Sequence, residues 1–169
     1  MIKKTIIILL SFLLLSFLLG CSGQTEEFQQ PVSFFYPEKA QEDGSITNVI
    51  RAELREGAVF SGDLQQLLTA YMVGPKDSVL YVPFPVHTEL NEVSVVDNKV
   101  ILHFNSAFGE LSSLERTIAC ACISKTCMEF TGAVSVEIFA EGILFDGVDS
   151  IVITQDNLLT EDNTPITES

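Results

Sequence analysis

The sequence is poor in basic residues, contains no tryptophan and has only two histidines. It carries 9 lysine and arginine residues against 23 acidic residues, so its formal net charge is −14. A surface of this charge repels phosphate backbones and anionic lipid headgroups, which argues against nucleic acid as a partner. No polybasic patch is present to hold the chain at a membrane.

Sequence motifs of the common catalytic and cofactor sites are also missing. There is no G-x-S-x-G, H-E-x-x-H, P-loop, G-x-G-x-x-G or C-x-x-C pattern. His87 lies in a proline-flanked segment, and His103 lies in an expected strand. A catalytic interpretation would make one of these histidines the base for a cysteine nucleophile. We favour the simpler one, an exposed loop histidine and a cross-strand neighbour of Glu92, and expect no enzyme activity, cofactor or metal site.

The amino terminus has the composition of a secretory signal. Lys3 and Lys4 precede an uncharged apolar run, which ends at the tetrapeptide LLGC, residues 18–21. This tetrapeptide resembles the lipobox of bacterial lipoproteins, in which the cysteine receives a diacylglycerol and becomes the first residue. An uncleaved membrane helix is the alternative, but the run is shorter than the roughly 20 residues that span a bilayer. We predict lipidation at Cys21, where two acyl chains anchor the chain to the extracytoplasmic face of the cell membrane.

Composition divides the chain into four parts. Residues 1–20 form the predicted signal peptide, and residues 21–31 contain the lipidated cysteine and a polar tether. Residues 32–154 form one domain, because the remaining length is too small for two ordinary ones. Residues 155–169 contain four acids and no base, and are expected to be a disordered acidic tail.

Periodicity predicts the elements of the domain. Residues 46–54 alternate as in a half-buried strand, with Asn48 as the exception. Apolar residues then recur at helical spacing from Leu64 to Met72, with Ser61 as the N-cap and Gly74 at the stop. The whole pattern predicts an α+β fold in the order β-β-α-β-β-α-β, a two-layer domain with two helices on one face of a mixed sheet. The other expected elements are strand 32–36, hairpin 92–104, helix 111–130 and strand 134–138, with 143–145 and 151–154 as extensions of the sheet.

The hairpin is the most sharply defined local structure. Asp97 and Asn98 tolerate the positive φ angles that a two-residue turn requires. This turn pairs Val95 with Val100 and places apolar residues on one face of both strands. A slip of one residue would invert that arrangement.

Three cysteines lie in the expected helix 111–130. Cys120 and Cys127 share a stripe with Ile123 and Phe130, but they are two turns apart and too distant for a disulfide. Cys120 and Cys122 point in different directions around the helix. We therefore expect buried, free thiols that pack as small apolar residues. Unpaired thiols in an exported chain would favour a reducing setting.

About 110 residues resemble the GerMN domain, a family named for the sporulation and spore-germination protein GerM. The matching segments are VSFFYP, LLTAYMVGP, PFPVHTEL, EVSVVDNKVILHFNSAF, TCMEF and AVSVEIFAEG. His103, Cys127 and Thr131 depart from the usual acidic residue, leucine and proline. The resemblance implies a fold similar to the ring-building modules of secretion systems, on a lipoprotein linked to sporulation or germination. It supplies no catalytic residues.

Three functions remain open at this stage. The first is a non-enzymatic module that assembles with itself or with envelope or sporulation proteins. The second is a module that binds a cell-wall glycan or peptide, although the absence of tryptophan weakens it. The third is a small envelope hydrolase, which has no supporting constellation of residues. An exposed apolar sheet edge would favour the first, and a concave aromatic cleft the second.

Overall fold

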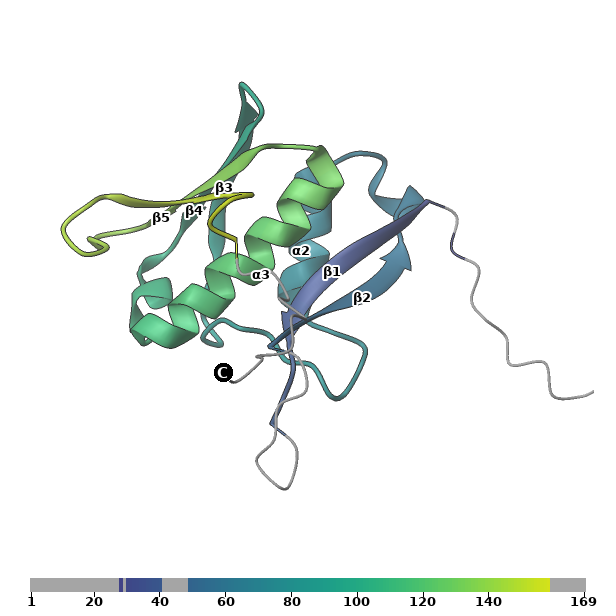
Figure 1. Cartoon of the computed structure of the whole chain (residues 1–169), viewed down its shortest axis with the longest axis horizontal. Coiled ribbons are helices and arrows are strands. Elements are labelled where there is room, and N and C mark those ends of the chain that lie inside the picture. Colours follow the sequence, from purple (N-terminus) through teal and green to yellow (C-terminus); the bar gives the residue numbers. More distant parts are fainter. Residues whose placement is uncertain (1–27, 29, 41–48, 159–169) are drawn as a thin grey trace, which may run out of the picture.

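The computed structural model describes residue 28, residues 30–40 and residues 49–158. The predicted signal peptide, the lipidation site Cys21 and residues 159–169 of the predicted tail lie outside the described residues. The order of elements confirms the predicted α+β class, and the expected extension at 151–154 is strand β6 (Figure 1). The other expected extension, 143–145, is not a strand, because only Phe145 makes an isolated bridge there, with Val148. The strands are β1 Pro31–Pro37, β2 Ile50–Glu56, β3 Leu90–Val96, β4 Lys99–Phe104, β5 Ser135–Ala140 and β6 Ser150–Thr154, the helices are α2 Leu64–Val73 and α3 Ser113–Thr131, and the 3-10 turns are η1 Ala58–Phe60 and η2 Ser106–Glu110.

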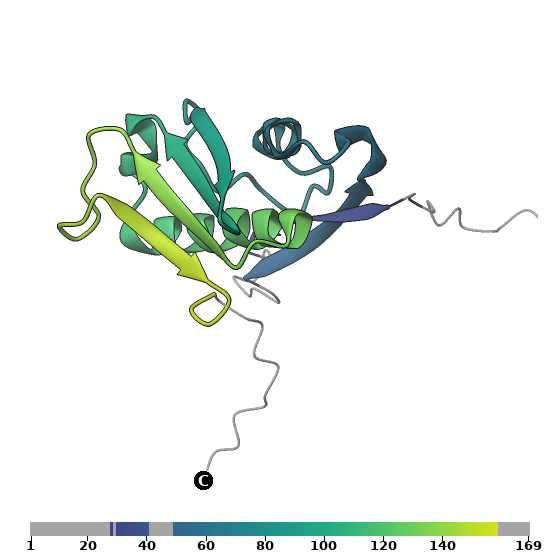
Figure 2. The ribbon, with the colours of Figure 1, turned by 90° about the horizontal axis from the view of Figure 1, so that it is seen from above.

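Four strands form a mixed sheet in the order β3-β4-β5-β6. The central pair β4–β5 is parallel, and the two outer pairs are antiparallel. Helix α3 connects the parallel pair, because a tight turn cannot join parallel strands. Both helices lie on the same side of this sheet (Figure 2). Alternate residues of β4 and β5 are buried against them, namely Val100, Leu102, Phe104, Val136, Ile138 and Ala140.

The β3–β4 hairpin has the predicted turn and register. Asp97 and Asn98 both have positive φ, at 49° and 60°. Val95 pairs with Val100, as expected from the sequence. The local rule that a two-residue turn selects such residues therefore fixes which side of β4 faces the core.

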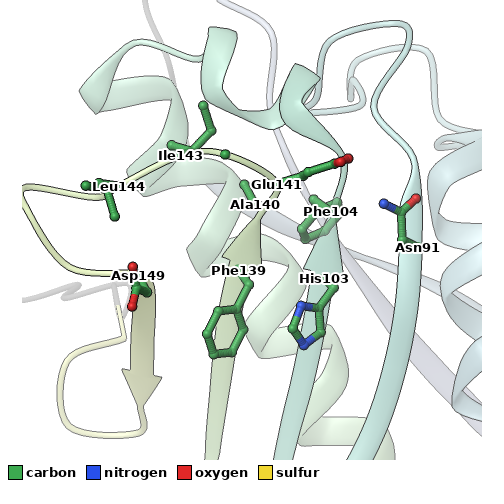
Figure 3. A pocket seen from close by; sticks show the side chains of 10 residues that line it. Asn91, His103, Phe104, Phe139, Ala140, Glu141, Ile143, Leu144 and Asp149 are labelled. Atoms are coloured by element: carbon green, nitrogen blue, oxygen red, sulfur yellow. The ribbon is translucent and has the colours of Figure 1, made fainter.

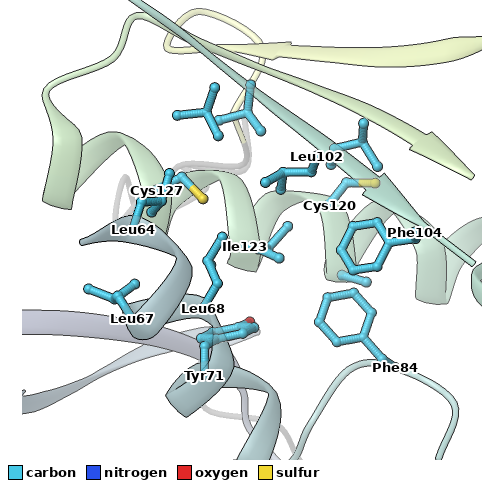
Figure 4. Close-up of a cluster of buried hydrophobic side chains, with 14 of the residues drawn as sticks. Leu64, Leu67, Leu68, Tyr71, Phe84, Leu102, Phe104, Cys120, Ile123 and Cys127 are labelled. Atoms are coloured by element: carbon cyan, nitrogen blue, oxygen red, sulfur yellow. The ribbon is translucent and has the colours of Figure 1, made fainter. Parts of the chain in front are cut away.

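Helix α3 supplies the centre of the core. A capping box starts it, because the Ser112 N–H donates to the Glu115 carboxylate and the Glu115 N–H donates to the Ser112 hydroxyl. Gly132, in the left-handed region, ends it. The predicted stripe is confirmed for Cys120 and Cys127, which are buried. Figure 4 shows these side chains between α2 and the strands of the sheet.

The start of α2 corrects a detail of the sequence interpretation. Asp63, not Ser61, is the N-cap, and its carboxylate accepts the N–H of Gln66. Ser61 has a positive φ of 48° and closes the preceding turn η1. The 3-10 turn η1, which the periodicity did not predict, ends at Ser61 and moves the start of the helix to Asp63.

The strands β1 and β2 form a separate two-stranded sheet instead of extending the larger one. β1 lies along α3, and its Phe35 N–H donates to the Thr126 hydroxyl at 3.0 Å. Both faces of β1 are covered, so that Phe34 is fully buried and Phe35 is 6% exposed. The Thr126 hydroxyl therefore accepts a backbone hydrogen bond at the edge of β1 that a third strand would otherwise have accepted.

Candidate functional site

The two histidines considered as bases lie in separate surroundings. His87 is in the loop before β3, and its side chain is 71% exposed. Its Nε2 is 3.9 Å from the Glu110 carboxylate, which is an ion pair only when the histidine is protonated. His103 lies on β4 and stacks on Phe139 of β5, with ring centroids 4.6 Å apart. The predicted loop position of His87 and the predicted pairing of His103 with Glu92 are both confirmed.

The three helix cysteines are free, and Cys120 and Cys127 are buried as predicted. Cys122 is buried as well, in a separate cluster with Phe35 and Ile50. Burial raises the pKa of the Cys120 thiol to about 12, and it raises the pKa of Cys122 and Cys127 further above the usual range. Because the thiolate is the reactive form, these groups are held in their unreactive state at neutral pH. Across the described ranges, no group of three histidine, cysteine or acidic residues could hold a metal ion.

The four-stranded sheet has an outer face, which points away from α2 and α3 (Figure 2). On this face, the Lys99 ammonium donates to the Glu137 carboxylate at 2.9 Å, and the Ser150 hydroxyl donates to its other oxygen at 2.9 Å. The Lys99 hydrogen bond first, and the Ser150 bond second, lower the pKa of Glu137. On the two central strands the outer face consists of Lys99, Ile101, His103, Ser135, Glu137 and Phe139.

A hollow lies at one end of the outer face (Figure 3). It has a volume of about 590 Å³ and is open to solvent. The stacked rings of His103 and Phe139 form its floor, and Asn91, Glu141 and Asp149 surround them (Figure 3). Aromatic faces beside carboxylates and an amide are suited to a small polar or cationic ligand.

Sequence reasoning missed this hollow, although it identified His103 as a cross-strand neighbour of Glu92. His103 and Phe139 meet because β4 and β5 pair in parallel with these residues in register. Period-2 alternation identifies a strand, but it does not identify the neighbour of that strand. The predicted strand 134–138 also ended one residue before Phe139, whereas β5 continues to Ala140.

A smaller hollow of about 300 Å³ lies over the proline-rich loop before β3. Tyr81, Pro83 and Pro85 line one side, while Glu110 and Ile118 line the other. The carboxylate of Glu110 is also the one that lies 3.9 Å from His87 Nε2. Neither hollow brings a nucleophile, a base and an orienting group together.

The protein-family model "Germane: Sporulation and spore germination" matches residues 22–144. Among solved structures, the chain is similar to a candidate lipoprotein from Clostridium perfringens, with 17% identity and a TM-score of 0.47, over 76% of this chain and 89% of the other. It is also similar to the tandem GerMN domains of the sporulation protein GerM from Bacillus subtilis, with 22% identity and a TM-score of 0.48, over 72% of this chain and 43% of the other. No curated protein matches. Along the described part of the chain, the helices are too short or too polar to cross a membrane.

Proposed function

The chain belongs to the Germane family of sporulation and spore germination, and we propose that it acts there as a non-enzymatic interaction module anchored to the cell envelope. The observation that carries this proposal is the unequal use of the four-stranded sheet. One face is buried under two helices, whereas the outer face of β4 and β5 is only half-buried and the edge strand β3 is half-buried to exposed along its length. Exposed sheet surface on a folded domain is a common means of recognising another protein.

The state of the reactive groups supports surface recognition over catalysis. The thiols are buried with raised pKa values, and the exposed His87 has only a distant carboxylate as partner. Nucleophilic catalysis needs a nucleophile and a base within hydrogen-bond reach. The proposal therefore assigns the work of the protein to contacts rather than to a reaction.

Anchoring is the second part of the proposal. The sequence LLGC at residues 18–21 follows a basic start and an apolar run, which are the parts of an export signal. Two acyl chains on Cys21 would keep the domain at the outer surface of the membrane, where its negative charge alone would not. Replacing Cys21 with serine should abolish incorporation of labelled fatty acid and release the protein from membranes.

The proposed function is tested by complementation in the native bacterium. A strain without the gene receives the wild-type chain, Cys21→Ser or His87→Ala, and heat-resistant spores and germination are counted. We expect Cys21→Ser to fail and His87→Ala to behave as wild type, with equal amounts of folded protein in each case. Full activity of Cys21→Ser would refute the anchor, and loss of activity in a folded His87→Ala protein would bring back the enzyme interpretation.

Binding of a cell-wall peptide or glycan is a second candidate, favoured by the stacked His103–Phe139 pair in the larger hollow. Calorimetric titration of the full chain in detergent with purified cell-wall fragments tests it. Phe139→Ala should abolish any heat of binding, while Val152→Ala, a change on β6 of the same outer face, should preserve it. An equal effect of both changes would rule out the hollow as the binding site.

A further inference from the structure

The two edge strands of the four-stranded sheet, β3 and β6, differ in whether their outer backbone groups are hydrogen-bonded. At β6, the side chain of Asn157 turns back onto the strand, accepting the Thr154 N–H at 2.6 Å and donating to the Val152 carbonyl at 3.2 Å. These are backbone groups that point away from β5, since the other side of β6 pairs with that strand. Asn157 therefore occupies the place that an added strand would need.

The free side of β3 has no such cap among the described residues. In a two-residue hairpin, the residues that flank the turn form a hydrogen-bonded pair, here Val96 and Lys99. Hydrogen-bonded and non-bonded pairs then alternate along the ladder, so Val93 and Val95 direct their N–H and carbonyl groups away from β4. We call the outward-facing N–H and carbonyl groups of Val93 and Val95 the open edge.

The side chains along β3 give the open edge a chemical character. Val95 and Val96 are each 52% exposed, which is apolar surface at a strand that has no outer neighbour in the described structure. Glu89, Glu92 and Asp97 line the strand and its turn without a basic residue among them. Lys99 on β4 is the nearest basic residue in the sequence, and its ammonium is already paired with the Glu137 carboxylate at 2.9 Å. The strand is therefore acidic as well as partly apolar.

From these observations we propose that the open edge receives an extended, basic segment of a partner protein as a fifth strand. This inference rests on the proposed function and names the surface and the chemistry of the partner. Backbone groups of Val93 and Val95 would supply hydrogen bonds, and lysine or arginine side chains of the partner would face Glu92 and its acidic neighbours. A second copy of this chain is a poorer occupant, because each copy carries a net charge of −14.

The test uses the full chain in detergent micelles and a capped peptide of alternating lysine and valine, about six residues long, which is the strand length typical of sheets. Binding is measured by fluorescence anisotropy, and the contact is located by hydrogen exchange with mass spectrometry. We expect the peptide to slow exchange across residues 90–98 and to bind at least tenfold more tightly than a glutamate–valine peptide. Added salt should weaken the binding.

Matched variants distinguish the open edge from the capped edge. Val95→Pro removes an N–H that faces outward and should weaken peptide binding at least tenfold. Val152→Pro removes the equivalent outward N–H from β6 and should leave binding unchanged. Glu92→Lys keeps the backbone intact, so it tests the charge of the site even if the proline variant does not fold, and it should weaken binding severalfold.

Three results would overturn the inference. They are the absence of binding, binding that Val95→Pro and Glu92→Lys do not weaken, and protection of residues 90–98 that grows with protein concentration without peptide, which would identify a second copy as the occupant. Failure here leaves the complementation results on anchoring unaffected. A module that binds the peptide as expected but works in cells without Cys21 would instead refute the proposed function alone.

Discussion

The β1–β2 hairpin and the outer face of the four-stranded sheet both combine ion pairs with aromatic rings, but they do so at different depths. Under the hairpin, the Arg55 guanidinium contacts Glu53, donates to the Gly74 carbonyl at 2.6 Å and lies over the Phe34 ring. Its side chain is only 10% exposed, whereas that of Lys99 on the outer face is 40% exposed. Polar groups in the first region are buried and hold the fold together, whereas the ion pair in the second remains partly exposed to solvent.

The hairpin needs this support because two strands alone are marginally stable in water. The rings of Tyr36 on β1 and Tyr71 on α2 stack with centroids 4.5 Å apart, and their hydroxyl groups link the strand to the helix. The Tyr36 hydroxyl donates to the Tyr71 carbonyl, and the Tyr71 hydroxyl donates to the Phe35 carbonyl, both at 2.8 Å. In the larger sheet, β4 and β5 are each paired on both sides.

High pH should produce the largest difference between the two regions. Burial, as the largest cause, raises the pKa of Tyr36, Tyr71 and Cys122 above their usual values. The stability linked to these groups is complete below the pKa of the unfolded chain, about 9 for the thiol and 10 for the phenols, and falls as the pH rises towards the folded pKa. Between its unfolded and its folded pKa, each group should lower the free energy of unfolding by about 1.4 kcal/mol per pH unit. Thermal melting of the full chain from pH 8 to pH 11 should show the decline, and a constant Tm would contradict the buried arrangement.

Removing the buried guanidinium should have the next largest effect. Arg55→Leu leaves the Glu53 carboxylate and the Gly74 carbonyl without their partner in a buried place, and should destabilise the protein by about 3 kcal/mol. Lys99→Leu is the matched change at the partly exposed pair and should cost less than about 1 kcal/mol. Denaturant unfolding measures both, and equal losses would abolish the distinction between the two regions.

The Tyr71 hydroxyl gives a smaller and more local test. Tyr71→Phe retains the stacked ring but leaves the Phe35 carbonyl without this donor, and should cost about 1–2 kcal/mol. Exchange of the β1 amides should become faster than that of β4. Phe139→Leu on the outer face serves as the control and should leave β1 exchange unaltered.

Low pH should produce the smallest effect, and on the other region. The Lys99 and Ser150 hydrogen bonds lower the pKa of Glu137, so its contribution is present above the usual carboxyl pKa and is lost as the pH falls through the lowered value. Glu137→Gln should therefore flatten the acid side of the stability profile slightly and leave the alkaline side unchanged. A change on the alkaline side would show that the two regions are coupled.

Local patterns predicted the local structure well. The positive-φ turn residues Asp97 and Asn98 and the cysteine stripe of α3 depend on neighbours within a few residues, and both were read from the sequence. The division into two sheets was not, because the covering of β1 depends on Thr126, 91 residues from its partner Phe35. The larger hollow was missed for the same reason, since parallel register joins His103 to Phe139. Alternation reveals that a strand exists, and only tertiary packing decides what lies beside it.

The bond between Phe35 and Thr126 also has a consequence for biogenesis. The ribosome releases β1 before α3, and Thr126 of the covering helix follows Phe35 by 91 residues. At about 5–20 residues per second, this interval lasts roughly 5–20 seconds. During that time the apolar segment VSFFY is exposed and has the composition of an aggregation-prone strand. Until α3 has emerged, β1 therefore lacks the helix that covers one of its faces.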